Sequence, residues 1–170
     1  MSDKTNLVLI GMPGAGKSTV GVVLAKKLGY YFMDSDLVIQ EREKRLLHEI
    51  IAQEGLQGFL EIENRINASL NTEHSIIATG GSVIYGTEAM AHFKQIGTVI
   101  YLKLSYEAIE NRLGDLRERG VALKEHQTLA QLYAERTPLY EQYADIIIDC
   151  EKLVLREVVE QIMQKLENHP

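Results

Sequence analysis

Short runs of consecutive hydrophobic residues alternate with longer segments in which hydrophobic positions recur at helical spacing. The runs predict buried parallel strands, which cover residues 4–10, 30–34, 75–79, 98–104 and 145–149. The longer segments predict helices that bury one face, over residues 18–28, 37–45, 106–113, 129–143 and 153–166. Strands that alternate with helices predict a doubly wound, three-layer α/β/α sandwich with right-handed crossovers.

Two helical stretches leave the local structure open. Residues 37–70 keep a helical pattern that is interrupted at His48 and around Gly55 and Gly58, so we expect a small helical insert after the second strand. Pro138 either kinks the helix that contains it or marks the start of a new one.

Composition narrows the class of protein. A chain of 170 residues, 45% of them hydrophobic, is expected to form one compact domain. Its 18 basic and 24 acidic residues give a formal charge of −6, which argues against a nucleic-acid partner. We expect a cytoplasmic protein without membrane contact, because the chain shows no signal peptide or long apolar run. The single Cys150 cannot form an internal disulfide, and we expect it to be structural.

Residues 11–19 read Gly-Met-Pro-Gly-Ala-Gly-Lys-Ser-Thr and match every fixed position of the phosphate-binding pattern G-x-x-x-x-G-K-[ST]. Backbone N–H groups and the N-terminus of the following helix would hold the phosphates of a nucleotide. Lys17 would reach the β- and γ-phosphates, and Ser18 would bind Mg²⁺. The predicted nucleotide-binding residues of this P-loop are Gly14, Ala15, Gly16, Lys17, Ser18 and Thr19.

Polar residues follow the second and third predicted strands, at the sheet edge where α/β proteins bind ligands. Asp34 and Asp36 follow the second strand, although Asp36 could instead only cap the next helix. Gly80 and Gly81 form either an ordinary turn or one that lets a substrate approach the backbone. Basic side chains between residues 114 and 127 predict a mobile loop, which is either plain surface or a lid.

Together these motifs resemble shikimate kinase over nearly the whole chain. The residues that carry the resemblance are the P-loop, Asp34-Ser35-Asp36, Phe59 to Glu63, Gly80-Gly81, Arg119 and Arg136-Thr137-Pro138-Leu139-Tyr140. The resemblance implies a P-loop kinase with a five-stranded parallel sheet in the order 2-3-1-4-5, an insert at about 36–65 and a lid at about 113–126. It also implies transfer of the γ-phosphoryl group of ATP to a ring hydroxyl of shikimate. We expect a monomer.

The family's residues on the nucleotide side correspond to single positions of this sequence. Asp34 corresponds to the acid that holds Mg²⁺ through water, and Arg112 to an arginine near the adenine. Arg119 corresponds to the lid arginine that reaches the phosphates, and with Lys17 it is an expected catalytic residue.

On the acceptor side, Asp36 corresponds to the acid that binds the substrate hydroxyls and helps to accept the proton. Gly80 and Gly81 match the first two glycines of a substrate loop. Arg136 matches an arginine that binds the substrate carboxylate, a task that suits a planar pair of donors.

Two positions depart from the family pattern, and both lie on the acceptor side. Leu60 stands where a second carboxylate-binding arginine is expected, which leaves Glu63 without its ion partner, and Ser82 stands where a third glycine is expected. Arg65 is the nearby replacement, but on an ideal helix it points about 140° away from Leu60. Three functions stay open: a shikimate kinase, a kinase for another small hydroxylated acid or amino acid such as homoserine, and a non-catalytic nucleotide-binding relative.

Overall fold

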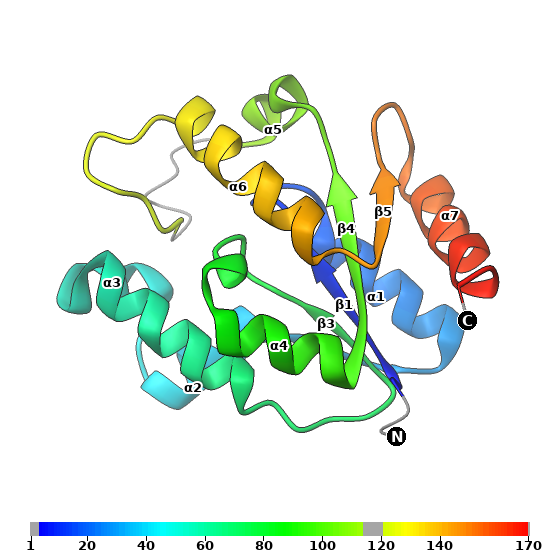
Figure 1. Cartoon of the computed structure of the whole chain (residues 1–170), viewed down its shortest axis with the longest axis horizontal. Helices are drawn as coiled ribbons and strands as arrows, with labels where there is room; N and C mark the ends of the chain where they lie inside the picture. Colours follow the sequence, from blue (N-terminus) through cyan, green and yellow to red (C-terminus); the bar gives the residue numbers. More distant parts are fainter. Residues whose placement is uncertain (1–3, 114–120, 170) are drawn as a thin grey trace.

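The computed structural model describes residues 4–113 and 121–169. Its centre is a five-stranded parallel sheet in the order β2-β3-β1-β4-β5, as the family resemblance implied (Figure 1). Each strand lies within two residues of its predicted bounds: β1 (Asn6–Ile10), β2 (Tyr31–Asp34), β3 (Ser75–Ala78), β4 (Gly97–Lys103) and β5 (Ile146–Asp149). Every residue of β1 is buried, because helices cover both faces of the sheet.

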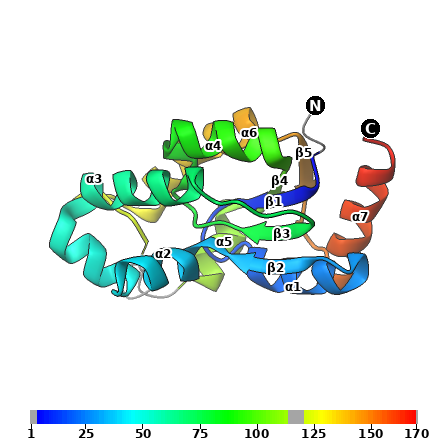
Figure 2. The same cartoon turned by 90° about the horizontal axis from the view of Figure 1, so that it is seen from below.

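The helices complete the predicted three layers. They are α1 (Lys17–Leu28), α2 (Ser35–Glu43), α3 (Leu47–Ala68), α4 (Thr87–Ile96), α5 (Tyr106–Arg112), α6 (Leu129–Tyr143) and α7 (Leu155–Glu167), with a short 3-10 helix η1 (Val83–Tyr85). Figure 2 shows α4 and α6 on one face of the sheet and α1 and α7 on the other. α2 and α3 form the predicted insert, in which α3 packs against both α2 and α4.

Two hydrophobic clusters fill the interior. The larger one lies between the sheet and its covering helices, and it includes Val8, Leu9 and Ile10 of β1. The smaller one, here called the insert cluster, consists of Ile39, Ile50, Phe59, Ile66 and Ala122. The insert therefore has a hydrophobic centre of its own, which fixes the part of α3 that faces the sheet edge.

Helix α4 was not predicted from the hydrophobic pattern. It buries Ala89, Met90 and Phe93 on one face, with the spacing of one helical turn. A parallel crossover between β3 and β4 also requires a connection of this length. Both signals were present in the sequence.

The insert and α6 resolve the two open stretches. The chain breaks its helical conformation at residues 44–46 and again at Gly55, where φ is 73° and ψ is 174°. The break predicted around Gly55 and Gly58 is confirmed at Gly55, whereas the break expected at His48 is wrong, because His48 lies inside α3. α6 continues through Pro138, so no new helix starts there.

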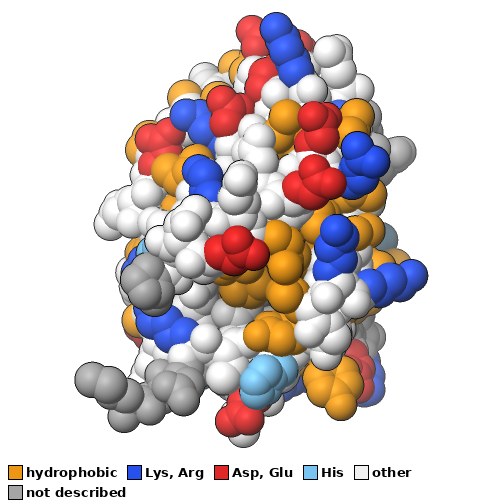
Figure 3. All heavy atoms as spheres, turned by 90° about the vertical axis from the view of Figure 1, so that its right-hand side faces the viewer, with side chains coloured by type: hydrophobic (Ala, Val, Ile, Leu, Met, Phe, Trp, Pro, Cys, Tyr) orange, Lys and Arg blue, Asp and Glu red, His pale blue; other side chains and the backbone are white. Residues whose placement is uncertain are grey.

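The face that carries α7 mixes charges of both signs with hydrophobic side chains (Figure 3). Large hydrophobic side chains exposed on β5 and at the start of α7 are Ile147, Val154 and Leu155. Within residues 4–113 and 121–169, no helix combines the length and the apolar character needed to cross a membrane.

Candidate active site

The P-loop curls around the N-terminus of α1. Gly14 and Gly16 have left-handed backbone conformations, with φ of 82° and 92°, which a side chain would strain. Lys17 is buried in the first turn of α1, and its Nζ donates to the carbonyl oxygens of Gly11 at 2.6 Å and Met12 at 2.8 Å. Burial lowers the pKa of Lys17 to about 8. The loop therefore has the shape of an anion cradle, with its lysine held against its own carbonyl groups.

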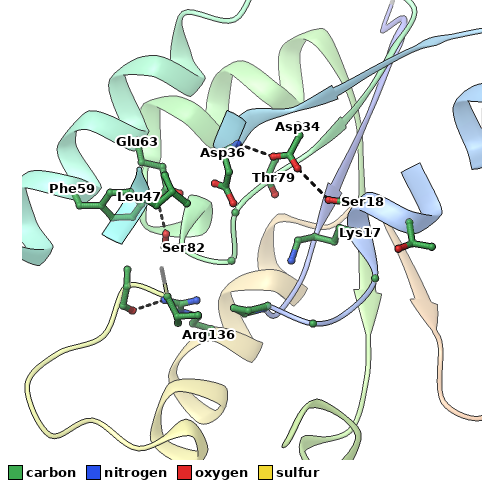
Figure 4. A pocket seen from close by; sticks show the side chains of 18 residues that line it. Lys17, Ser18, Asp34, Asp36, Leu47, Phe59, Glu63, Thr79, Ser82 and Arg136 are labelled. Carbon is green, nitrogen blue, oxygen red and sulfur yellow. Dashed lines mark hydrogen bonds between the residues drawn. The ribbon is translucent and has the colours of Figure 1, made fainter. Parts of the chain in front are cut away.

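Asp34 ends β2 and caps α2. Its Oδ1 accepts hydrogen bonds from the backbone N–H groups of Asp36 at 2.9 Å and Leu37 at 3.4 Å. Its Oδ2 accepts from Ser18 Oγ at 3.2 Å (Figure 4). The helix cap is therefore Asp34, and the alternative in which Asp36 only caps the helix is wrong. The side chain of Asp36 is therefore not used to cap α2.

A cavity of about 240 Å³ opens where the P-loop, the start of α2, α3, the loop after β3 and α6 meet. Figure 4 shows Asp36 and Glu63 approaching it from the insert, Lys17 from the P-loop and Arg136 from α6. Segments that are far apart in the sequence thus converge on one space. The predicted site residues on its wall are Gly14, Gly16, Lys17, Ser18, Thr19, Asp34, Asp36, Gly80, Gly81 and Arg136.

Asp36 and Glu63 are two carboxyl groups that approach the same glycine. A Cβ atom on Gly80 would lie 2.6 Å from Asp36 Oδ1 and 3.1 Å from Glu63 Oε2, so this approach requires a glycine. Burial, reinforced by the charge of Asp34, raises the pKa of Asp36 to about 6. Burial raises the pKa of Glu63 to about 8. At neutral pH, Glu63 is therefore mostly protonated and Asp36 mostly ionised.

Ser82 holds the other side of the Glu63 carboxyl group. Its Oγ donates to Glu63 Oε1 at 2.7 Å, and both residues are buried. Glu63 Oε2 has no hydrogen-bond partner among the described residues. The sequence marked Glu63 and Ser82 as separate departures from a pattern, but the contact between them was not predicted.

Arg136 enters the cavity from α6 and is only 1% exposed. Its Nη2 donates to the carbonyl oxygen of Ala122 at 2.8 Å, and its guanidinium carbon lies 5.5 Å from the centre of the Tyr85 ring. Its Nε is buried without a partner among the described residues. A Cβ atom on Gly81 would lie 2.8 Å from Arg136 Nη1, so the glycine leaves room for the guanidinium group. Tyr140 Oη donates to the carbonyl oxygen of Gly81 at 2.6 Å and anchors that turn.

Arg112 lies beside the P-loop. Its Nη1 donates to the carbonyl oxygen of Gly14 at 3.1 Å. Arg112, Ala15 and Cys150 are part of the wall of a second cavity of about 190 Å³. Burial raises the pKa of the Cys150 thiol to about 11, so the thiol stays protonated. The predicted lid residue Arg119 lies outside the described residues.

The insert brings no second arginine to the 240 Å³ cavity, whose described wall contains Arg136 alone of that type. Leu60 packs against the insert cluster. The side chain of Arg65 is 67% exposed, and its Nη2 lies 3.7 Å from Glu43 Oε2. Arg65 therefore does not replace the missing group, as its position on the helix predicted.

Comparisons with known proteins match the chain to one family over nearly its whole length. The family model for shikimate kinase matches residues 13–167. A shikimate kinase of Sulfurihydrogenibium sp. is 34% identical over 163 residues, which cover 95% of this chain and 98% of that protein. One from Thermodesulfovibrio yellowstonii is 37% identical over 165 residues, which cover 95% of each chain.

Solved structures agree with the sequence comparison. The shikimate kinase from Acinetobacter baumannii in complex with shikimate has a TM-score of 0.82 and 28% identity, covering 98% of this chain and 95% of that chain. The shikimate kinase from Aquifex aeolicus has a TM-score of 0.81 and 31% identity, covering 95% and 96%.

Proposed function

The chain belongs to the shikimate kinase family of ATP-dependent phosphotransferases that act on an alcohol group, and we propose that its own acceptor is shikimate. The convergence of Lys17, Asp36 and Arg136 on one cavity is the observation that supports this most strongly. These residues supply a cation for the transferred phosphate, a base for the hydroxyl and a guanidinium group for the carboxylate.

We assign the phosphates of ATP to the P-loop and the adenine to the side where Arg112 lies. Lys17 would exchange two loop carbonyl oxygens for phosphate oxygens. Ser18 Oγ and Asp34 Oδ2 are oxygen donors of the kind that Mg²⁺ prefers. The described residues contain no group of three or more His, Cys, Asp or Glu that could hold a metal ion, so phosphates would complete its ligands. Bound Mg²⁺ would neutralise charge on the phosphates.

Asp36 accepts the proton of the acceptor hydroxyl in this proposal. Its pKa of about 6 keeps it mostly ionised at neutral pH yet basic enough to bind a proton. The hydroxyl oxygen attacks the γ-phosphorus, the bond to the β,γ-bridging oxygen breaks, and ADP leaves while the proton passes to Asp36. The family resemblance assigns Arg119 to the phosphates during this transfer.

Arg136 binds the carboxylate of the acceptor. Its guanidinium group is buried and its Nε has no partner within residues 4–113 and 121–169, which suits a charge-assisted contact with a planar anion. Gly80 and Gly81 allow the acceptor to approach the backbone between Asp36 and Arg136. With a single arginine, carboxylate recognition should be weaker by about tenfold to a hundredfold than with two.

One observation favours a second acceptor class. Glu63 carries a buried carboxyl oxygen near Asp36 that has no partner in the described part of the chain, where Arg136 is also the single arginine on the cavity wall. A hydroxylated amino acid such as homoserine would place its carboxylate against Arg136 and its ammonium group against the two acids.

A coupled ADP-release assay tests both candidates. The full chain, ATP and Mg²⁺ are combined with a panel of small hydroxy acids and hydroxy amino acids that includes shikimate and homoserine. Turnover of shikimate alone supports the proposal, and turnover of homoserine alone supports the second class. No turnover with any acceptor would favour a non-catalytic nucleotide-binding protein. Lys17→Ala serves as the control for contaminating kinases.

A further inference from the structure

Ser82 uses its hydroxyl on a side chain from the insert. It precedes η1 in a position where a serine often caps the helix, but its side chain makes no capping hydrogen bond. Its Oγ instead donates to Glu63 Oε1 at 2.7 Å. Ser82 is 5% exposed and Glu63 is 2% exposed, so water does not compete for this hydrogen bond.

The second oxygen of Glu63 lies beside Gly80, a residue of the cavity wall. Gly80 lines the cavity, and a Cβ atom there would lie 3.1 Å from Glu63 Oε2 and 2.6 Å from Asp36 Oδ1. Oε2 and the Asp36 carboxyl group, which would receive the acceptor hydroxyl, therefore approach the same residue of the cavity wall. It is buried and has no partner among the described residues.

The hydrogen bond from Ser82 also decides which oxygen carries a proton. Asp36 and Glu63 both approach Gly80, and two negative charges this close repel each other, so one of the two acids keeps its proton. Glu63 is the more deeply buried of the two, so it is the acid that keeps the proton. Because Oε1 already accepts from Ser82, the proton of Glu63 belongs on Oε2, which is then a donor.

We infer that Ser82 is a positioning residue that holds Glu63 as a hydrogen-bond donor to an oxygen atom of the acceptor. A neutral hydrogen bond from Glu63 thus takes the place of the arginine contact that is absent at Leu60. A protonated carboxyl group beside the acceptor favours a hydroxyl group over an ammonium group. The inference rests on the proposed transfer of phosphate to a small hydroxy acid and deepens it.

Removal of the Ser82 hydroxyl tests the positioning role. Ser82→Ala should raise the KM for shikimate about threefold to tenfold, the effect of one hydrogen bond, with kcat and the KM for ATP changed less than about twofold. Ser75→Ala is the matched control, because Ser75 is also buried and hydrogen-bonded but lies at the opposite end of β3. Ser82→Thr keeps the hydroxyl and should recover most of the acceptor affinity.

Two substitutions of Glu63 separate a donor from a charged group. In Glu63→Gln, the amide oxygen can accept from Ser82 while the amide nitrogen donates to the acceptor, so the KM for shikimate should rise less than about threefold. Glu63→Met has a similar length but no donor, and its KM should rise about tenfold or more. In the Glu63→Met background, Ser82→Ala should have almost no further effect, because Ser82 acts through Glu63.

The outcomes separate this inference from the proposed function. Wild-type protein that phosphorylates no acceptor overturns both. Turnover of shikimate with equal KM values for Ser82→Ala and Ser75→Ala overturns the positioning role alone. A Glu63→Gln variant that loses as much acceptor affinity as Glu63→Met would show that Glu63 acts as a charged carboxylate, and it would overturn the inference.

Discussion

The buried Glu63 carboxyl group should make the protein less stable as the pH rises. Its pKa is 4.5 in an unfolded chain and about 8 in the folded protein, so between these values the folded state binds more protons. The free energy of unfolding therefore falls with rising pH, and this stabilising contribution is complete only below pH 4.5.

The window between pH 6 and pH 8 isolates this group. Asp36 contributes with the same sign, but only between its unfolded pKa of 3.8 and about 6. Lys17 contributes with the opposite sign between about 8 and 10.5, because its pKa is lowered on folding. At about 1.36 kcal/mol per pH unit, one proton bound only in the folded state gives about 2 kcal/mol over this window. We therefore expect the free energy of unfolding to fall by about 1–2 kcal/mol between pH 6 and pH 8.

Urea denaturation at pH 6, 7 and 8 measures this loss. Glu63→Gln removes the titrating group and keeps its shape. Between pH 6 and pH 8 its free energy of unfolding should therefore fall less than that of the wild type, by a difference of at least about 1 kcal/mol. Glu61→Gln is the matched control, because Glu61 is exposed on the same helix and its replacement should leave the pH dependence unchanged. Parallel curves for the wild type and Glu63→Gln would refute the reasoning.

Lys17→Ala should lower kcat more than tenfold without unfolding the protein, and a smaller loss in a steady-state assay would contradict its role at the γ-phosphate. Asp36→Asn should lower kcat about a hundredfold or more while the Kd for ATP, measured by calorimetry, stays within a few-fold; an equal loss of ATP binding would place this acid on the nucleotide side. Arg136→Lys keeps the charge but not the planar pair of donors, so the KM for shikimate should rise about tenfold while the KM for ATP is unchanged. Arg119→Lys should act mainly on kcat, and a loss below about threefold would argue against contact with the transferred phosphate.

The parallel sheet could be predicted because its three central strands, β1, β3 and β4, contain continuous hydrophobic runs that are buried. The P-loop could be predicted because its glycines are required by local backbone conformation, as the left-handed φ values of Gly14 and Gly16 show. In both cases the determining interaction is local in sequence. Helix α4 was missed although its signal is local, because only Ala89, Met90 and Phe93 of this helix are fully buried.

The acceptor side could be predicted only in part, because its contacts join residues far apart in the chain. The hydrogen bond between Ser82 and Glu63 depends on how α3 packs beside the loop after β3, and no sequence pattern encodes that packing. The alternative in which Asp36 caps α2 was wrong for a related reason. Asp34 and Asp36 are both suitable cap residues, and the position at which β2 ends decides between them.

The separate hydrophobic centre of the insert has an evolutionary consequence. Leu60 packs in the insert cluster, whereas Lys17 and the P-loop are placed by α1 and β1, which belong to the larger cluster. Substitutions that reshape the insert can therefore accumulate without disturbing the strand that carries the P-loop. After duplication of such a gene, acceptor preference can change while the residues for phosphoryl transfer from ATP are kept. A substitution at the position of Leu60, where the family pattern has an arginine, is an early change of the kind expected when acceptor preference shifts.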